Sequence, residues 1–271
     1  MATLEFKDYS IYYEVYGKGK PLVILNGIMM STASWQMFIS SFSQKNQLIL
    51  VDMLDQGQSS KLEGLEYTQD IQVEVVKTLI EKLNLKDVAL FGISYGGEVA
   101  IKFAIKYPHL VERCLLFNTT AYTNNWLKEI GIAWNLASTN AEQYYGTTIP
   151  VIYSSEFYES KIKWMSDRKK ILLNVFANPV FQRAMVRLTN SANSLDERQN
   201  LHKIKCPCLI VGCDEDAITP LSHQKYLHEN IKNSSLVIIP GSGHASMYEK
   251  PLLFSSLVLG FVHSLIIPDV V

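Results

Sequence analysis

Short runs of apolar residues recur along the chain, and most of them end at a polar residue or a glycine. Residues 9–16 are rich in β-forming side chains, and six further apolar runs have the length of strands. These runs cover residues 22–25, 48–51, 88–91, 114–117, 207–212 and 236–239. Because they are continuous rather than alternating, they are typical of strands that are buried on both faces of a parallel sheet.

Two segments between the later runs show helical periodicity. Apolar residues recur every three or four positions over residues 67–85 and again over residues 94–107, where Pro108 follows. Strands that alternate with helices in this way predict an α/β fold: a mostly parallel sheet with helices on both faces.

The alternation stops between about residue 120 and residue 205. Polar, aromatic and helical stretches follow one another there without a clear buried strand. We therefore predict a core made of residues 1–119 and 206–271, with residues 120–205 inserted as a helical cap.

An apolar stretch near the C-terminus raises the question of a membrane anchor. Residues 252–267 contain no Asp, Glu, Lys or Arg, but a membrane span needs about 20 apolar residues. Phe254, Val258, Phe261 and Leu265 recur at helical spacing, which predicts an amphipathic helix packed on the sheet and no membrane span.

Composition narrows the possible partners and cofactors. The 271 residues carry 25 Lys and Arg against 26 Asp and Glu, a formal net charge of −1 that argues against nucleic acid as a partner. The four cysteines and six histidines show no zinc-site spacing, so we expect free buried thiols and no metal. The first residues lack an export signal, which predicts a cytoplasmic protein. Nothing in the composition indicates the oligomeric state.

The sequence Gly92-Ile93-Ser94-Tyr95-Gly96 lies directly between a predicted strand and a predicted helix. A Gly-x-Ser-x-Gly pattern in this setting is a nucleophile elbow, in which the serine occupies a strained turn and its Oγ is exposed at the helix N-terminus. We therefore identify Ser94 as the candidate nucleophile.

A serine nucleophile needs a base, and a carboxylate must orient that base. After the strand at 207–212 come three acidic residues, Asp214, Glu215 and Asp216, and His244 follows the last strand. Both segments lie at carboxyl ends of strands, where open α/β sheets place their active sites. The residues alone leave the choice of acid open.

With these motifs, nearly the whole chain resembles an α/β-hydrolase-superfamily serine hydrolase. In that family the acid commonly stands in Asp-x-x-Thr/Val-Pro, so the resemblance selects Asp216, with Asp214 as the alternative, and Gly-His selects His244 as the base. The oxyanion hole is built from the backbone N–H that follows the nucleophile, here that of Tyr95. The resemblance assigns the second N–H to Ile28, although Asn26 stands where the family usually has His.

The first sixty residues also resemble, locally, the acyltransferase that joins two 3-hydroxyacyl chains in the synthesis of rhamnolipid precursors. The resemblance rests on residues 26–34, which begin with Asn-Gly, and on Gly57-Gln58-Ser59.

The predicted cap is rich in aromatic residues, which often line apolar pockets. We predict that Met29, Trp126 and Trp134 bind substrate. The function expected is that of a serine hydrolase that cleaves a carboxylic ester or thioester of an apolar acyl group through an acyl-enzyme, without a cofactor. An acyltransferase acting on 3-hydroxyacyl thioesters is the alternative, and a non-catalytic ligand-binding protein on the same fold is a weaker one.

Overall fold

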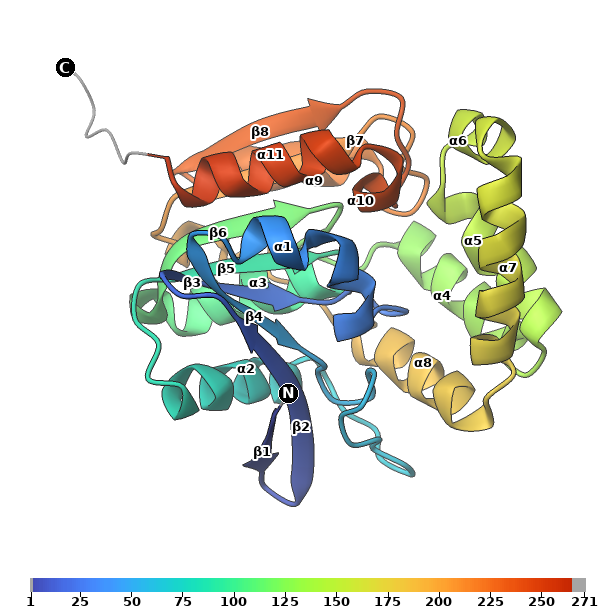
Figure 1. The fold of residues 1–271 in the computed structure, drawn as a ribbon, viewed down its shortest axis with the longest axis horizontal. Helices are drawn as coiled ribbons and strands as arrows, with labels where there is room; N and C mark the ends of the chain where they lie inside the picture. Colours follow the sequence, from blue (N-terminus) through green and yellow to red (C-terminus); the bar gives the residue numbers. More distant parts are fainter. Residues whose placement is uncertain (1, 265–271) are drawn as a thin grey trace.

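The described residues, 2–264 of the computed structural model, build one eight-stranded sheet (Figure 1). Its strands are β1 (Ala2–Phe6), β2 (Tyr9–Tyr16), β3 (Lys20–Leu25), β4 (Asn46–Val51), β5 (Val88–Ile93), β6 (Val111–Phe117), β7 (Cys208–Cys213) and β8 (Ser234–Ile239). They follow the spatial order β1-β2-β4-β3-β5-β6-β7-β8. All the strands from β3 to β8 run parallel to one another. Strand β2 is antiparallel to β4, and β1 is antiparallel to β2. The predicted mostly parallel sheet is therefore confirmed.

All seven predicted strands are present, and the structure adds β1 at the edge. In β1, Leu4 and Phe6 are buried while Thr3 and Glu5 are exposed. Apolar and polar residues alternate in this short strand because one of its faces meets solvent. It therefore lacks the continuous apolar run that identified the strands from β3 to β8.

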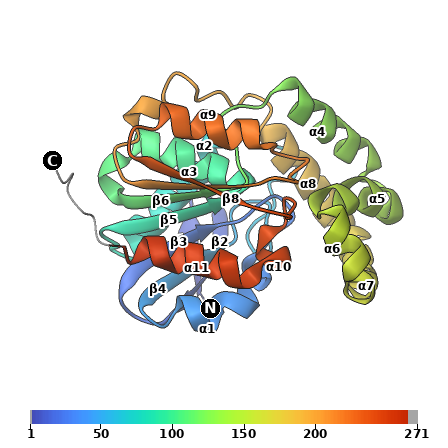
Figure 2. The same cartoon turned by 90° about the horizontal axis from the view of Figure 1, so that it is seen from above.

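Helices cover both faces of the sheet (Figure 2). On one face lie α2 (Asp70–Lys82), α3 (Tyr95–Lys106) and α9 (Leu221–Asn230), and on the other lie α1 (Ile39–Phe42) and α11 (Pro251–Val262). Successive residues of a strand point to opposite faces: Val23 and Leu25 pack under the first group of helices, Leu22 and Ile24 under the second. The central strands are buried on both sides, as their continuous apolar runs predicted.

The segment between β6 and β7, all of which is described, contains helices and no strand of the sheet. These helices are α4 (Asn125–Ala137), α5 (Ala141–Ile152), α6 (Ser155–Ser160), α7 (Ile162–Phe176) and α8 (Pro179–Ser191). They lie beyond the carboxyl ends of the strands (Figure 1). Arg187 of α8 forms an ion pair with the buried Asp55 of the core, with Nη2 2.5 Å from Oδ1. The helices thus occupy the segment predicted as a cap, while the domain boundaries at residues 119/120 and 205/206 stay a prediction.

The apolar C-terminal stretch forms α11, which packs on the sheet through Phe254, Val258 and Val262. Leu265, the last residue of the predicted apolar stripe, lies outside the described residues. Within residues 2–264, no helix is long and apolar enough to cross a membrane. All four cysteines are buried free thiols, as predicted.

Candidate active site

Ser94 lies in a strained turn between β5 and α3. Its φ of 53° and ψ of −125° are values that a residue with a Cβ rarely adopts. The flanking glycines permit this turn, since a Cβ on Gly92 would collide with the backbone of Gly96 and one on Gly96 with the backbone of Leu25. The side chain of Ser94 is left partly exposed at the N-terminus of α3.

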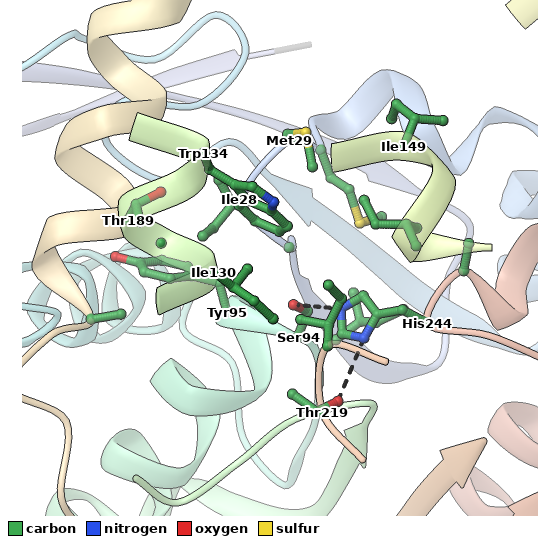
Figure 3. Close-up of a pocket in the computed structure, with 18 of the residues that line it drawn as sticks. Ile28, Met29, Ser94, Tyr95, Ile130, Trp134, Ile149, Thr189, Thr219 and His244 are labelled. Atoms are coloured by element: carbon green, nitrogen blue, oxygen red, sulfur yellow. Dashed lines mark hydrogen bonds between the residues drawn. The ribbon is translucent and has the colours of Figure 1, made fainter. Parts of the chain in front are cut away.

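Two hydrogen bonds connect Ser94 to His244 and His244 to Asp216. The distance from His244 Nε2 to Ser94 Oγ is 2.9 Å, and that from His244 Nδ1 to Asp216 Oδ2 is 2.8 Å (Figure 3 shows the Ser94–His244 contact). The structure therefore brings together three residues that are 28 and 150 positions apart in the chain. This is the geometry that allows His244 to take the proton of Ser94 while a carboxylate holds the imidazole in one tautomer.

Asp216 is buried and accepts several hydrogen bonds. Oδ1 accepts from the backbone N–H groups of Ile218 and Thr219, both at 2.8 Å, and Oδ2 accepts from Thr219 Oγ1 at 2.8 Å and Asn118 Nδ2 at 2.9 Å. Burial alone would raise the pKa of Asp216, but His244 and these hydrogen bonds outweigh it and lower the pKa. The carboxylate is therefore kept ionised beside the imidazole.

The other two acidic residues of this loop do not contact His244. Asp214 Oδ1 accepts from the backbone N–H of Gly241 at 2.8 Å, so it supports the loop that leads to the histidine. Glu215 is exposed. Of the three candidates, only Asp216 lies within hydrogen-bonding distance of the imidazole in the described structure.

The two candidate oxyanion donors lie on either side of Ser94. Tyr95 is the first residue of α3, and Ile28 lies in the loop after β3; both line the same pocket as Ser94. Neither backbone N–H has an acceptor among residues 2–264. Asn26 holds the base of this loop, since its Nδ2 donates to Val51 O at 2.8 Å and its Oδ1 accepts from Trp35 Nε1 at 2.7 Å.

A cavity of about 160 Å³ lies above Ser94, between the sheet edge and the helices α4, α5, α7 and α8. Its lining is mainly apolar and includes Met29, Trp134, Ile130 and Ile149 (Figure 3). Met29 and Trp134, which the sequence analysis predicted to bind substrate, therefore do face the candidate nucleophile's pocket.

Trp126, which was also predicted to bind substrate, does not line this pocket. Its side chain is 52% exposed, and its Nε1 donates to Ala217 O at 2.9 Å. Successive helical residues point about 100° apart, and Leu127, the next residue of α4, is the one that lines the pocket. Aromatic composition could not indicate which face of α4 would meet the core.

Sequence reasoning missed several polar residues at the site. Asn118, which binds Asp216, directly follows β6, and this place at a strand end was a signal available in the sequence. Its φ of 47° lies in the left-handed region. Glu249 was not signalled by any motif. Its carboxylate accepts from Gly243 N at 3.0 Å, from Ser154 N at 3.1 Å and from Ser154 Oγ at 2.5 Å. It therefore joins the loop that carries His244 to the start of α6.

Arg168 of α7 also lines the pocket. Its guanidinium carbon lies 4.3 Å from the ring centre of Tyr248 and 5.2 Å from that of Trp164. Its Nε is buried without a hydrogen-bond partner, and no carboxylate in the described part of the chain forms an ion pair with it. The mainly apolar pocket thus also contains a positive charge.

Comparison with known proteins agrees with this geometry. Residues 20–251 match the family model described as alpha/beta hydrolase fold. The chain is 26% identical to the uncharacterized hydrolase YugF of Bacillus subtilis (93% of this chain, 94% of that protein). It is 25% identical to a pimeloyl-[acyl-carrier protein] methyl ester esterase of Nitrosomonas europaea (91% and 97%).

Among solved structures, the chain resembles MGS-M2, an alpha/beta hydrolase enzyme from a Medee basin deep-sea metagenome library. The TM-score is 0.97, with 44% identity over the full length of both chains. The enol-lactonase from Burkholderia xenovorans LB400 shares the fold alone, at a TM-score of 0.84 and 17% identity over 97% of this chain and all of the other. The matched family model and these relatives show that the chain belongs to the α/β-hydrolase family and is a hydrolase.

Proposed function

We propose that this chain is a serine hydrolase that cleaves a carboxylic ester or thioester through an acyl-enzyme. Ser94 attacks the carbonyl carbon while His244 takes its proton, and Asp216 stabilises the imidazolium that forms. The backbone N–H groups of Ile28 and Tyr95 bind the oxyanion. His244 then donates its proton to the leaving oxygen or sulfur, and in the second half it activates water, which releases the acid and restores Ser94.

The observation that carries this proposal is the Ser94–His244–Asp216 hydrogen-bond chain at the floor of the pocket. The largely apolar lining supports an apolar acyl group as the part of the substrate that lies in the cavity. The esterase among the relatives supports the ester class.

A fluorophosphonate probe, which reacts with activated serines, tests the proposal. We expect one label per wild-type chain and none in Ser94→Ala, with esterase turnover reduced by three or more powers of ten, because loss of a triad member removes nucleophilic catalysis. His244→Ala should lose labelling as well. Ser160→Ala, which changes an exposed serine of α6, is the matched control and should behave as the wild type.

Near-normal turnover in Ser94→Ala would overturn the mechanism. Absence of labelling and turnover in the folded wild type would instead favour the non-catalytic binding protein.

A further inference from the structure

A second carboxyl group lines the pocket and has no part in the chemistry proposed for Ser94. Glu98 lies four residues after Ser94, and its backbone N–H donates to Ser94 O at 3.2 Å. The Glu98 side chain is only 9% exposed, and it belongs to the pocket lining. A ligand in the cavity can therefore reach a carboxyl group that bulk water scarcely reaches.

Glu98 has little to stabilise a negative charge. Its hydrogen-bond partner in the described structure is Gln69, whose Nε2 donates to Oε2, and no cation among residues 2–264 pairs with it. Burial therefore raises the pKa of Glu98 to about 8, and the hydrogen bond from Gln69 lowers it only in part. At neutral pH the group is mainly a protonated carboxylic acid.

The hydrogen bond from Gln69 leaves one carboxyl oxygen of Glu98 free. Gln69 Nε2 donates to Oε2, whereas Oε1 has no partner among the described residues, so a proton on Oε1 can be donated to a ligand. This oxygen is not fully enclosed by the protein, so a ligand can reach it. The pocket thus contains an O–H donor without an acceptor. Thr123 also lines the pocket, but its hydroxyl already donates to Ala192 O at 2.6 Å.

We propose that Glu98 is a specificity-determining residue that donates a hydrogen bond to an oxygen atom carried by the acyl group, and so selects keto-, ether- or hydroxyl-bearing acyl groups over pure hydrocarbons. The inference rests on the proposed acyl-enzyme chemistry at Ser94. A buried polar group that a ligand leaves unpaired costs binding energy, and sites of this kind discriminate strongly against analogues that lack the partner atom.

Matched pairs of acyl esters test the inference. Each pair has the same chain length, and one member carries a keto or ether oxygen whose position is scanned along the chain. For the best position we expect wild-type kcat/KM to favour the oxygenated member by about tenfold or more. Glu98→Met, which has a similar length but no donor, should abolish this preference. Glu98→Gln, which retains an N–H donor, should keep most of it.

Thr189→Val is the matched control, because Thr189 is another pocket-lining residue with a hydroxyl and Val has nearly its shape. It should leave the preference unchanged. A preference that survives in Glu98→Met, or one that disappears in Thr189→Val instead, would overturn the assignment.

The pH dependence of the preference is a second readout. The ratio of kcat/KM for the two members of a keto pair cancels every pH effect on the catalytic steps that both substrates share. The other titratable groups of the pocket lining are Tyr95, on the same helix as Glu98, and Tyr153, Arg168, His244 and Tyr248. The wild-type ratio should fall as pH rises through about 8, because the ionised carboxylate no longer donates. It should stay flat in Glu98→Gln.

The outcomes separate the two proposals. If neither ester is turned over and Ser94 is not labelled, the proposed function fails. If both esters are turned over at equal rates at every oxygen position, only the role of Glu98 fails. Should Glu98→Met not fold, as judged by its thermal unfolding, the pH profile of the wild type and the Glu98→Gln ratio decide the matter.

Discussion

At the scale of single residues, the Asp216 carboxylate holds the imidazole through Oδ2 while backbone donors occupy Oδ1. Asp216→Asn keeps the shape but places an N–H₂ group where His244 Nδ1 must donate. We expect kcat to fall about 10⁴-fold, because the imidazole is held in the wrong tautomer. Steady-state ester hydrolysis measures this loss. Asp214→Asn, which retains an oxygen for Gly241, is the matched variant and should have a small effect; the reverse order would show that Asp214 is the acid.

The buried acid Glu98 also makes a prediction about folding. Its pKa is raised from 4.5 to about 8 in the folded protein, so between these values the folded state keeps a proton that the unfolded chain has lost. The stability that this group contributes is thus present below about pH 4.5 and is lost as pH rises towards 8. Glu98→Gln does not titrate. Thermal unfolding should therefore show a Tm difference that grows in favour of Glu98→Gln from about pH 5 to pH 8, and a constant difference would contradict the raised pKa.

At the scale of elements, the loop that carries His244 is attached to the cap helices rather than only to the core. Glu249 binds both Gly243 and Ser154, and Ala245 N donates to Ile152 O at 3.1 Å. A Cβ on Gly243 would collide with the backbone at Ile152 and Ser154. The position of the imidazole therefore depends on the seating of α5 and α6.

Glu249→Ala tests this dependence. Oε1 of Glu249 accepts from both Gly243 N and Ser154 N, so removing the carboxylate leaves both backbone donors without their acceptor and lets the two loops shift, and small displacements of catalytic groups are costly. We expect kcat to fall about tenfold or more and probe labelling of Ser94 to slow, with little change in KM. Glu156→Ala removes a nearby exposed carboxylate of α6 and should leave both rates unchanged. Equal rates in the two variants would show that the cap contact does not position His244.

At the scale of the whole molecule, the cavity lies between two parts of the chain, with Ser94 at its floor and α4, α5, α7 and α8 above it. An acyl chain that fills the cavity leaves water, and each buried methylene contributes roughly 0.8 kcal/mol. Across a series of straight acyl esters we therefore expect kcat/KM to rise several-fold per added methylene until the cavity is full, and then to level off. A response that is flat in chain length would remove the apolar acyl group from the proposal.

The same enclosure bears on what attacks the acyl-enzyme. Hydrolysis yields free acid, whereas transfer to a 3-hydroxyacyl acceptor yields a condensed ester from the same intermediate. We expect free acid to be the main product when thioesters are supplied with such an acceptor, as measured by chromatography. Condensed ester that forms faster than free acid would establish the acyltransferase alternative.

The sequence by itself determined the features that depend on neighbouring residues. The buried strands were recognisable because a strand covered on both faces needs an unbroken apolar run, and the turn at Ser94 because its geometry requires glycines at fixed spacing. The loops of Asp216 and His244 each follow a predicted parallel strand, and parallel strands end at the same edge of the sheet, so the sequence placed both loops at that edge. Even so, the choice of Asp216 over Asp214 needed the family resemblance.

Tertiary structure alone decided what depends on segments far apart in the chain. Helical periodicity gives a helix but not its rotation against remote partners, so Leu127 rather than Trp126 reached the pocket. In the sequence, Glu98 and Glu249 are indistinguishable from ordinary polar residues of helices. Their chemistry arises because packing removes water from Glu98 and brings Glu249 against Ser154, 95 residues away. Burial and long-range contact, which no local pattern encodes, set the properties of these two carboxyl groups.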